Sequence, residues 1–236
     1  MNFNICAQKF LIFTIGIGMN NSKKILRWCI PITWIFAAAN VAYLIVLSFG
    51  ALAWLWVNGI LAPIPAIASL VSGETVYSAY WVVTSTHQII VVIAYTVNAF
   101  WIYHASLHAA KIDPDPTRIG PAWTVAWFLI PIANLWMPYR AMKQVWHSSS
   151  GIAQDINAPV SKEFALWWGC WTISWLASAV SYRVFWPAGE DGLLFAIALD
   201  LVAVPFAIIS AFLFLRIMKD ITGYQQERTQ SDEVFA

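Results

Sequence analysis

Asp200 places a carboxyl group inside an apolar stretch of the chain, residues 193–218. An ionisable group in such surroundings could serve acid–base chemistry beside a second reactive group, or line a polar path beside other polar groups. Small residues surround it at a helical 4-3-4-3 spacing, at Ala196, Ala203, Ala207 and Ser210. Because small residues let helices approach closely, we expect Asp200 to point into a helical bundle. The alternative is a buried acid with only a packing role, either protonated or satisfied by a neighbouring hydroxyl.

Polar residues in the apolar segment 76–107 offer partners for this acid. On a helical wheel His87 and Asn98 lie about 20° apart, and the same arc of about 100° holds Thr84, Gln88 and Tyr95. His87 and Asp200 lie at similar depths if both segments start from the same face of the bundle. We therefore predict a direct contact between them, which would offset the desolvation of both groups. Arg183 is the alternative partner of Asp200.

Other chemistry has little support in the sequence. It contains no H-E-x-x-H pattern, no ordered Ser/His/Asp set and no glycine-rich phosphate loop. His104 and His108 are four positions apart, but a metal site needs a third and usually a fourth ligand, and only Asp113 and Asp115 are near in sequence. The three cysteines lack C-x-x-C spacing. We predict no metal, no cofactor and no catalytic residue.

The composition shows which solvent surrounds these residues. Charged residues make up 11% of the chain and hydrophobic residues 60%, whereas a water-soluble protein has roughly a quarter charged. No charged residue lies between Arg27 and Glu74 or in the range 75–110. A net charge of +1 also provides no basic surface for nucleic acid. The chain is therefore predicted to be an all-α integral membrane protein, with tryptophans in the aromatic belts.

Hydrophobic lengths predict a bundle of four spans. The expected spans are 26–56, 76–107, 163–185 and 193–218. The stretch 60–71 is short and contains two prolines, so we expect an interfacial or re-entrant loop there. With four crossings both termini lie on the cytoplasmic side, and the link 186–192 lies outside.

The third hydrophobic segment, 122–137, is predicted to bend and return without crossing. It contains Pro131, ends before Pro138, and is flanked on both sides by basic links that the positive-inside rule keeps in the cytoplasm. Asn134 lies close enough to both prolines to satisfy backbone groups that they free. Residues 139–149 then form a short amphipathic helix, predicted to lie in the interface with Arg140 and Lys143 toward lipid phosphates.

The two ends of the chain are expected to lie outside the membrane domain, 22–222. The segment 1–21 contains an apolar run too short to span a bilayer, and the sequence after Met19 is typical of a cytoplasmic N-terminus, so translation is predicted to start there. The polar tail 223–236 is predicted to be disordered and cytoplasmic.

The sequence around Pro131 is similar to a known family motif. It has the form P-x-W-x-x-x-W-x-x-x-P-x-x-N-x-x-x-P-Y-x-x-x-x-x-x-W, with motif residues Trp127, Pro131, Asn134, Pro138, Tyr139 and Trp146. It resembles the bacterial membrane family catalogued as domain of unknown function 4328, over residues 27–222. The resemblance implies a protein of the bacterial cytoplasmic membrane and carries no activity, substrate or catalytic residue. Many members of that family have an arginine-rich end to the second span, where this chain has His104 and His108.

Three functions remain open at this point. The favoured one is a non-catalytic interaction or regulatory component of the envelope, whose partners are the lipid bilayer and a membrane protein or a second copy of the chain. The second is a small transporter or permeation protein, with a polar intramembrane site made of Asp200, His87, Asn98 and Asn134. The third is an intramembrane or lipid-modifying enzyme. A dry, closely packed seam around Asp200 would favour the first, and a water-filled cavity the second.

Overall fold

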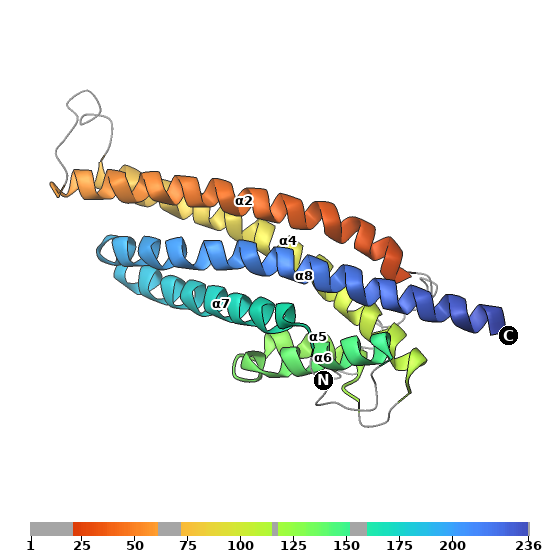
Figure 1. Cartoon of the computed structure of the whole chain (residues 1–236). Helices are drawn as coiled ribbons and strands as arrows, with labels where there is room; N and C mark the ends of the chain where they lie inside the picture. The colour runs from red at the N-terminus through yellow and green to blue at the C-terminus, as the bar shows by residue number, and fades with distance from the viewer. Residues whose placement is uncertain (1–20, 61–71, 115–117, 152–159, 236) are drawn as a thin grey trace, which may run out of the picture. The chain divides into compact units, whose positions relative to one another are not determined.

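The computed structural model describes residues 21–60, 72–114, 118–151 and 160–235. Every regular element in these ranges is helical (Figure 1). The predicted start at Met19 and the predicted loop at 60–71 therefore lie outside the described residues, except for Ile60. In chain order the elements are α2 (Asn21–Val57), α4 (Gly73–Ile112), α5 (Pro121–Ala126), η1 (Trp127–Leu129), η2 (Ala133–Leu135), α6 (Met137–Ser150), α7 (Lys162–Ala188), η3 (Gly189–Gly192) and α8 (Leu193–Phe235).

Three helices in the described part of the chain are long and apolar enough to cross a membrane. They are Lys24–Val57, Gly73–Ile112 and Leu193–Arg228. This agrees with three of the four predicted spans. Helix α7 has 27 residues, so its length suffices, but it is not among the three. Its many tryptophans and serines lower its hydropathy, because indole and hydroxyl groups favour the interface over hydrocarbon.

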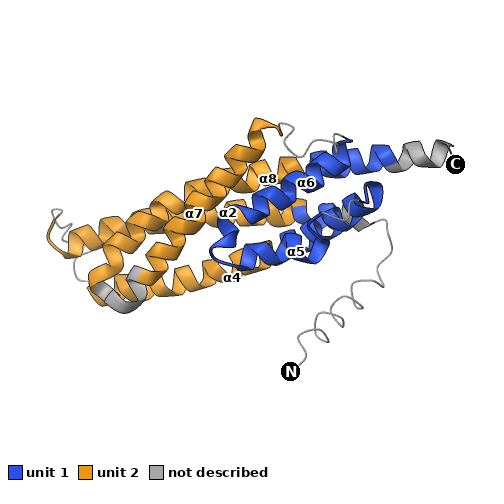
Figure 2. Cartoon of the chain, turned by 90° about the horizontal axis from the view of Figure 1, so that it is seen from below, with its two compact units in different colours: residues 1–29, 98–158, 219–236 blue, residues 30–97, 159–218 orange. Residues whose placement is uncertain are grey.

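The chain divides into two compact units, coloured in Figure 2. Unit 2 contains residues 30–97 and 159–218, and therefore most of α2, α4, α7 and the first half of α8. Unit 1 contains residues 1–29, 98–158 and 219–236, with the ends of α4 and α8 and all of α5 and α6. The boundaries fall within α2, α4 and α8, so these helices continue from one unit into the other.

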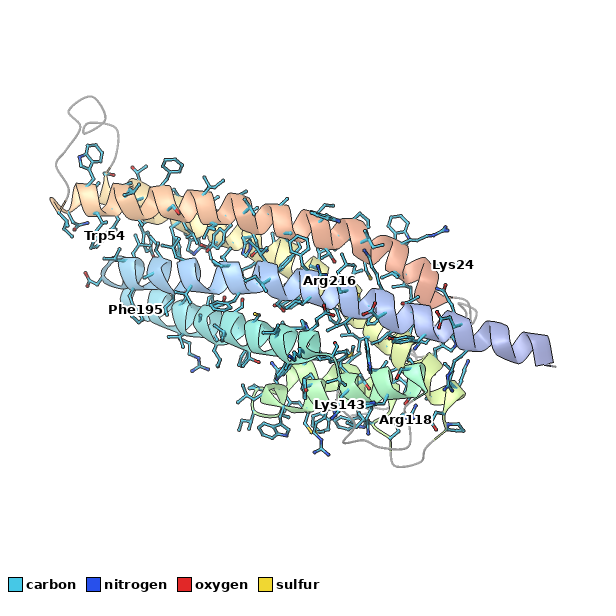
Figure 3. All side chains as sticks on the ribbon, viewed as in Figure 1. Lys24, Trp54, Arg118, Lys143, Phe195 and Arg216 are labelled. Atoms are coloured by element: carbon cyan, nitrogen blue, oxygen red, sulfur yellow. The ribbon has the colours of Figure 1, made fainter. Side chains whose placement is uncertain are left out.

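Helices α2, α4 and α8 form an apolar core in the described part of unit 2. Its buried members are Tyr43, Leu47, Val76, Tyr80, Leu193, Ala196, Ile197 and Val204. Trp54 near the end of α2 packs against this cluster, and Figure 3 shows it at the same end of the unit as Phe195 near the start of α8. Helices α2 and α8 are therefore antiparallel, with the short η3 turn joining α7 to α8 at that end.

The segment 122–137 is broken as predicted. Helix α5 ends at Ala126 and the η1 turn at Leu129; the next residue, Ile130, is extended (φ −95°, ψ 108°), and Pro131 follows. A residue before proline is pushed out of the helical region by the proline ring, which accounts for the break. Pro121 and Pro138 lie in the first turns of α5 and α6, where no intrahelical N–H is required.

Two expectations for unit 1 need correction. The tail 223–236 is not disordered as predicted, because α8 continues as a helix to Phe235. Gln225 is fully buried and donates hydrogen bonds to the Ala105 carbonyl (2.9 Å) and the Ser149 hydroxyl (3.0 Å). The amphipathic helix is present as α6, but its apolar side contacts protein: Trp146 packs edge-on against Tyr224, with ring centroids 5.3 Å apart. Packing partners that are distant in sequence therefore order both segments.

Candidate functional site

The Asp200 carboxyl group lies at a meeting point of three helices in unit 2. Tyr43 from α2 and Tyr80 from α4 donate hydrogen bonds to its Oδ2 atom, at 2.9 and 2.8 Å. The three residues are 7%, 5% and 7% exposed respectively. A carboxyl oxygen offers two lone pairs, so these two phenols use the full acceptor capacity of Oδ2. The acid therefore connects α8 to both other core helices.

Two further hydroxyl groups surround this arrangement. The Tyr43 hydroxyl lies 3.0 Å from the Thr84 hydroxyl on α4. Ser181 on α7 contacts the Asp200 carboxyl and is also 3.2 Å from the Ala196 carbonyl, to which it donates. Three long helices, α2, α4 and α7, thus contribute polar groups around the acid of the fourth, α8. We call the set of Asp200, Tyr43, Tyr80, Thr84 and Ser181 the Asp200 network.

His87 lies beside this network. Its ring stacks on the ring of Tyr43, with centroids 4.2 Å apart and planes 9° apart. Its Nε2 lies 3.3 Å from the Asn40 Oδ1. The Asn40 amide nitrogen donates to the Phe36 carbonyl at 2.8 Å, which leaves Oδ1 as the acceptor. The hydrogen bond then requires the proton on Nε2 of His87, which assigns the tautomer of this ring.

The predicted contact between Asp200 and His87 is not among the described hydrogen bonds; both residues contact Tyr43 instead. The described hydrogen bonds of Asp200 go to phenol and hydroxyl groups, and His87 bonds to Asn40. Arg183, the alternative partner, is exposed. Tyr43 reaches the carboxyl group from α2 with its hydroxyl and stacks on the His87 ring, so it contacts both groups.

Sequence reasoning missed the two tyrosines that contact the acid. Tyr80, Thr84 and His87 follow a 4-3 spacing and so share a helical face, which the wheel analysis could have extended by one turn. On α2, Asn40 and Tyr43 are three residues apart on one face. Two polar residues on one face of an apolar helix could have predicted that this face contacts polar groups of other helices.

Asn98 and Asn134, predicted to belong to the same polar site, both fall in unit 1. The Oδ1 atoms of both are buried and have no hydrogen-bond partner among the described residues. Asn134 is 1% exposed, and its backbone N–H donates to the Ile130 carbonyl at 2.7 Å. The backbone of Asn134, rather than its side-chain oxygen, therefore closes the turn around Pro131.

The other motif residues shape the hairpin from α5 to α6. Trp127 packs against Trp123 with ring centroids 5.0 Å apart, Pro138 is buried at the start of α6, and Trp146 is 8% exposed. Tyr139 is half-buried one residue later than Pro138. These roles are structural. Within the described ranges no group of three or more His, Cys, Asp or Glu residues could hold a metal ion.

Comparison with known proteins identifies the family. Searches of curated proteins and of solved structures gave no significant match. A family model matches residues 66–223, a range that includes α4 through most of α8 and leaves out α2. It covers more than half of the chain and contains the whole hairpin motif. The chain therefore belongs to the family described as Domain of unknown function (DUF4328).

Proposed function

We propose that this protein is a non-catalytic, multi-pass component of the bacterial cytoplasmic membrane that acts through interaction or regulation. The observation that carries the proposal is the hydrogen bonding and burial of the Asp200 carboxyl group. Its Oδ2 accepts two hydrogen bonds from two other helices, and all three side chains are less than a tenth exposed. A reactive or ligand-binding acid needs access for a substrate or ligand, whereas this acid is buried and holds helices together.

The surroundings of the site favour a closely packed seam between helices rather than a transport path. An open groove of about 250 Å³ lies between α2 and α4 in unit 2, and Tyr80 is among its lining residues. Apart from Thr75 and Tyr80 its lining consists of glycine and apolar side chains, which do not solvate an ion or a polar substrate. The Asp200 carboxyl is not part of the lining.

An enzymatic role has less support. Acid–base chemistry needs a second reactive group that converges on Asp200 with room for substrate. His87 is the candidate, but its described hydrogen bond goes to Asn40 and not to Asp200. The groups that contact the acid are the Tyr43 and Tyr80 phenols, already engaged as donors, and the Ser181 hydroxyl.

The proposed topology has four spans, with both termini in the cytoplasm. Helix α7 is long enough to cross and is joined to α8 by the short η3 turn. The hairpin from α5 to α6 would enter the bilayer from the cytoplasmic side and return to it. Cysteines introduced at Thr117 and Ala153, on either side of the hairpin, and at Asp191 test this in intact cells. We expect a membrane-impermeant maleimide to label only Asp191→Cys from outside; labelling of Thr117→Cys or Ala153→Cys overturns the topology.

A flux assay distinguishes the proposed interaction or regulatory role from transport. The purified protein is reconstituted into vesicles that contain a pH-sensitive dye, and a proton gradient is imposed. We expect no flux above that of empty vesicles. If the protein does conduct protons, and the flux is lost in Asp200→Asn but kept in Glu163→Gln, the proposed role is wrong. The function would then be proton permeation through the Asp200 network.

A further inference from the structure

The hairpin from α5 to α6 ends in an exposed apolar tip, residues 129–132. Leu129 is 80% exposed and Ile132 is 73% exposed, and Ile130 and Pro131 between them are exposed as well. Four consecutive apolar residues without cover are costly in water. The tip has the composition of a segment that sits among acyl chains.

Tryptophans stand behind this tip on both arms of the hairpin. Trp123 on α5 is 54% exposed, and Trp136 at the start of α6 is 48% exposed. Exposed indole rings favour the boundary between hydrocarbon and headgroups. Their place after the tip on each arm matches the order of layers in one leaflet of a bilayer.

Two cations follow on the outer side of α6. Arg140 is exposed and Lys143 is half-buried, four and seven residues after Trp136. At a rise of about 1.5 Å per residue they lie roughly 6 and 10 Å along α6 from the indole, on the same helical face. The opposite face is buried in unit 1 through Ala141, Met142 and Val145. Helix α6 is therefore fixed by protein on one side and presents its cations on the other.

The hairpin sequence contains no acidic residue that could neutralise these cations. No aspartate or glutamate occurs between Arg118 and Asp155. Among the described residues the ion pairs are Arg118 with Asp113 and Arg216 with Glu163, so neither Arg140 nor Lys143 is paired there. An anionic partner is needed to complement this surface.

We propose that the hairpin is a recognition surface for anionic phospholipids. Arg140 and Lys143 bind the headgroup phosphates, the two tryptophans lie at the interface, and the tip enters the acyl-chain region of the same leaflet. This inference rests on the proposed function only in that the hairpin enters the membrane. It adds a lipid preference, which a re-entrant segment does not require.

A fluorophore at the tip tests the preference. Ile132→Cys is labelled in a background with Cys6→Ser and Cys170→Ser; Cys29 is fully buried and stays. The labelled protein is reconstituted into equimolar phosphatidylglycerol and phosphatidylcholine, with one of the two lipids brominated. We expect brominated phosphatidylglycerol to quench more strongly, with a relative association constant raised by up to about 5-fold per cation.

Paired variants locate the effect. Arg140→Gln with Lys143→Gln should bring the relative association constant close to one, with unchanged thermal unfolding. Lys24→Gln with Arg27→Gln, at the exposed start of α2, removes the same charge and should leave the constant unchanged. Equal quenching by the two lipids in the parent protein, or an equal loss in both double variants, overturns the proposal.

The same label distinguishes failure of this inference from failure of the re-entrant hairpin. If aqueous iodide quenches the fluorophore and neither brominated lipid does, the hairpin does not enter the bilayer and both proposals fall. If both brominated lipids quench equally and iodide does not, the hairpin enters but has no headgroup preference. In that case only the present inference is wrong.

Discussion

The Tyr43 phenol donates a hydrogen bond of 2.9 Å to the Asp200 carboxyl group across 157 positions of the sequence. Tyr80 donates to the same oxygen at 2.8 Å, so one atom joins three long helices. In the apolar interior of a membrane bundle such a bond has no competition from water, although the membrane-inserted unfolded state retains partners of its own. The polar network is thus expected to specify how α2, α4 and α8 align.

Removing either phenol should weaken the bundle. For Tyr43→Phe and for Tyr80→Phe we expect losses of about 0.5–2 kcal/mol in unfolding free energy, because each removes one donor from a buried acid. Unfolding of the purified protein in mixed detergent micelles with increasing SDS measures this. Tyr182→Phe, at a 58% exposed phenol on α7, is the matched control and should change stability by less than about 0.5 kcal/mol.

Combined substitutions test whether the acid and the phenols act together. Asp200→Leu leaves two buried phenols without their acceptor, whereas Asp200→Asn keeps an acceptor oxygen. We therefore expect Asp200→Leu to be the more destabilising change, and its cost to shrink in the Tyr43→Phe, Tyr80→Phe background. An equal cost of Asp200→Leu in both backgrounds would contradict the network, since coupled residues are non-additive.

His87 should contribute to the unfolding free energy through the stacking of its ring rather than through a charge. It stacks on Tyr43 with centroids 4.2 Å apart, and such ring pairs are worth about 0.5–1.5 kcal/mol beyond their area. His87→Phe should therefore retain more stability than His87→Ala, and adding Asn40→Leu to His87→Phe should recover part of the loss. The same SDS unfolding series measures all three variants. If His87→Phe is as unstable as His87→Ala, the stacking account is wrong.

Much of this architecture could be predicted from the sequence because hydrophobic length and proline placement are local signals. The spans of α2, α4 and α8 and the break at Pro131 follow from such signals. The buried acid on α8 was also identifiable, since a carboxyl group in an apolar segment is unusual. Helical angle also singled out His87, which stacks on Tyr43, although Gln88 and Tyr95 of the same arc are exposed.

The missed features depend on tertiary contacts. Tyr43 and Tyr80 were overlooked because tyrosines in a membrane helix fit the aromatic belt equally well. Their contact with an acid becomes visible only when α8 is placed beside α2 and α4. The continuation of α8 past Thr222 likewise depends on Gln225, whose partners Ala105 and Ser149 are far away in sequence. Helical periodicity gives the face of one helix, but it does not give the rotation of its neighbour.

Arg118 closes the end of α4 and should not be replaceable by lysine. Its two terminal nitrogens donate in different directions, to the Ala109 carbonyl at 2.8 Å and to the Asp113 carboxyl at 2.6 Å. For Arg118→Gln we expect a loss of about 1–2 kcal/mol in unfolding free energy, because the Asp113 carboxyl group loses its cation and the Ala109 carbonyl keeps only the Asp113 N–H as donor. Arg118→Lys should recover less than half of this, since one ammonium does not reproduce the planar fork. Full recovery by lysine would indicate that charge alone matters.

The end of α6 provides a test with a matched pair of glycines in unit 1. Gly151 follows α6 with φ 84°, a left-handed conformation, and a Cβ there would clash with the Arg228 guanidinium. Gly151→Ala should therefore cost about 1 kcal/mol or more in unfolding free energy. Gly223, within α8, has nothing within 4 Å of a Cβ, so Gly223→Ala should stabilise the helix by about 0.5–1 kcal/mol. Adding Arg228→Ala to Gly151→Ala should remove the clash while the backbone strain remains, and SDS unfolding of these variants measures each contribution. Equal effects of the two glycine substitutions would show that the left-handed turn does not hold the end of α6.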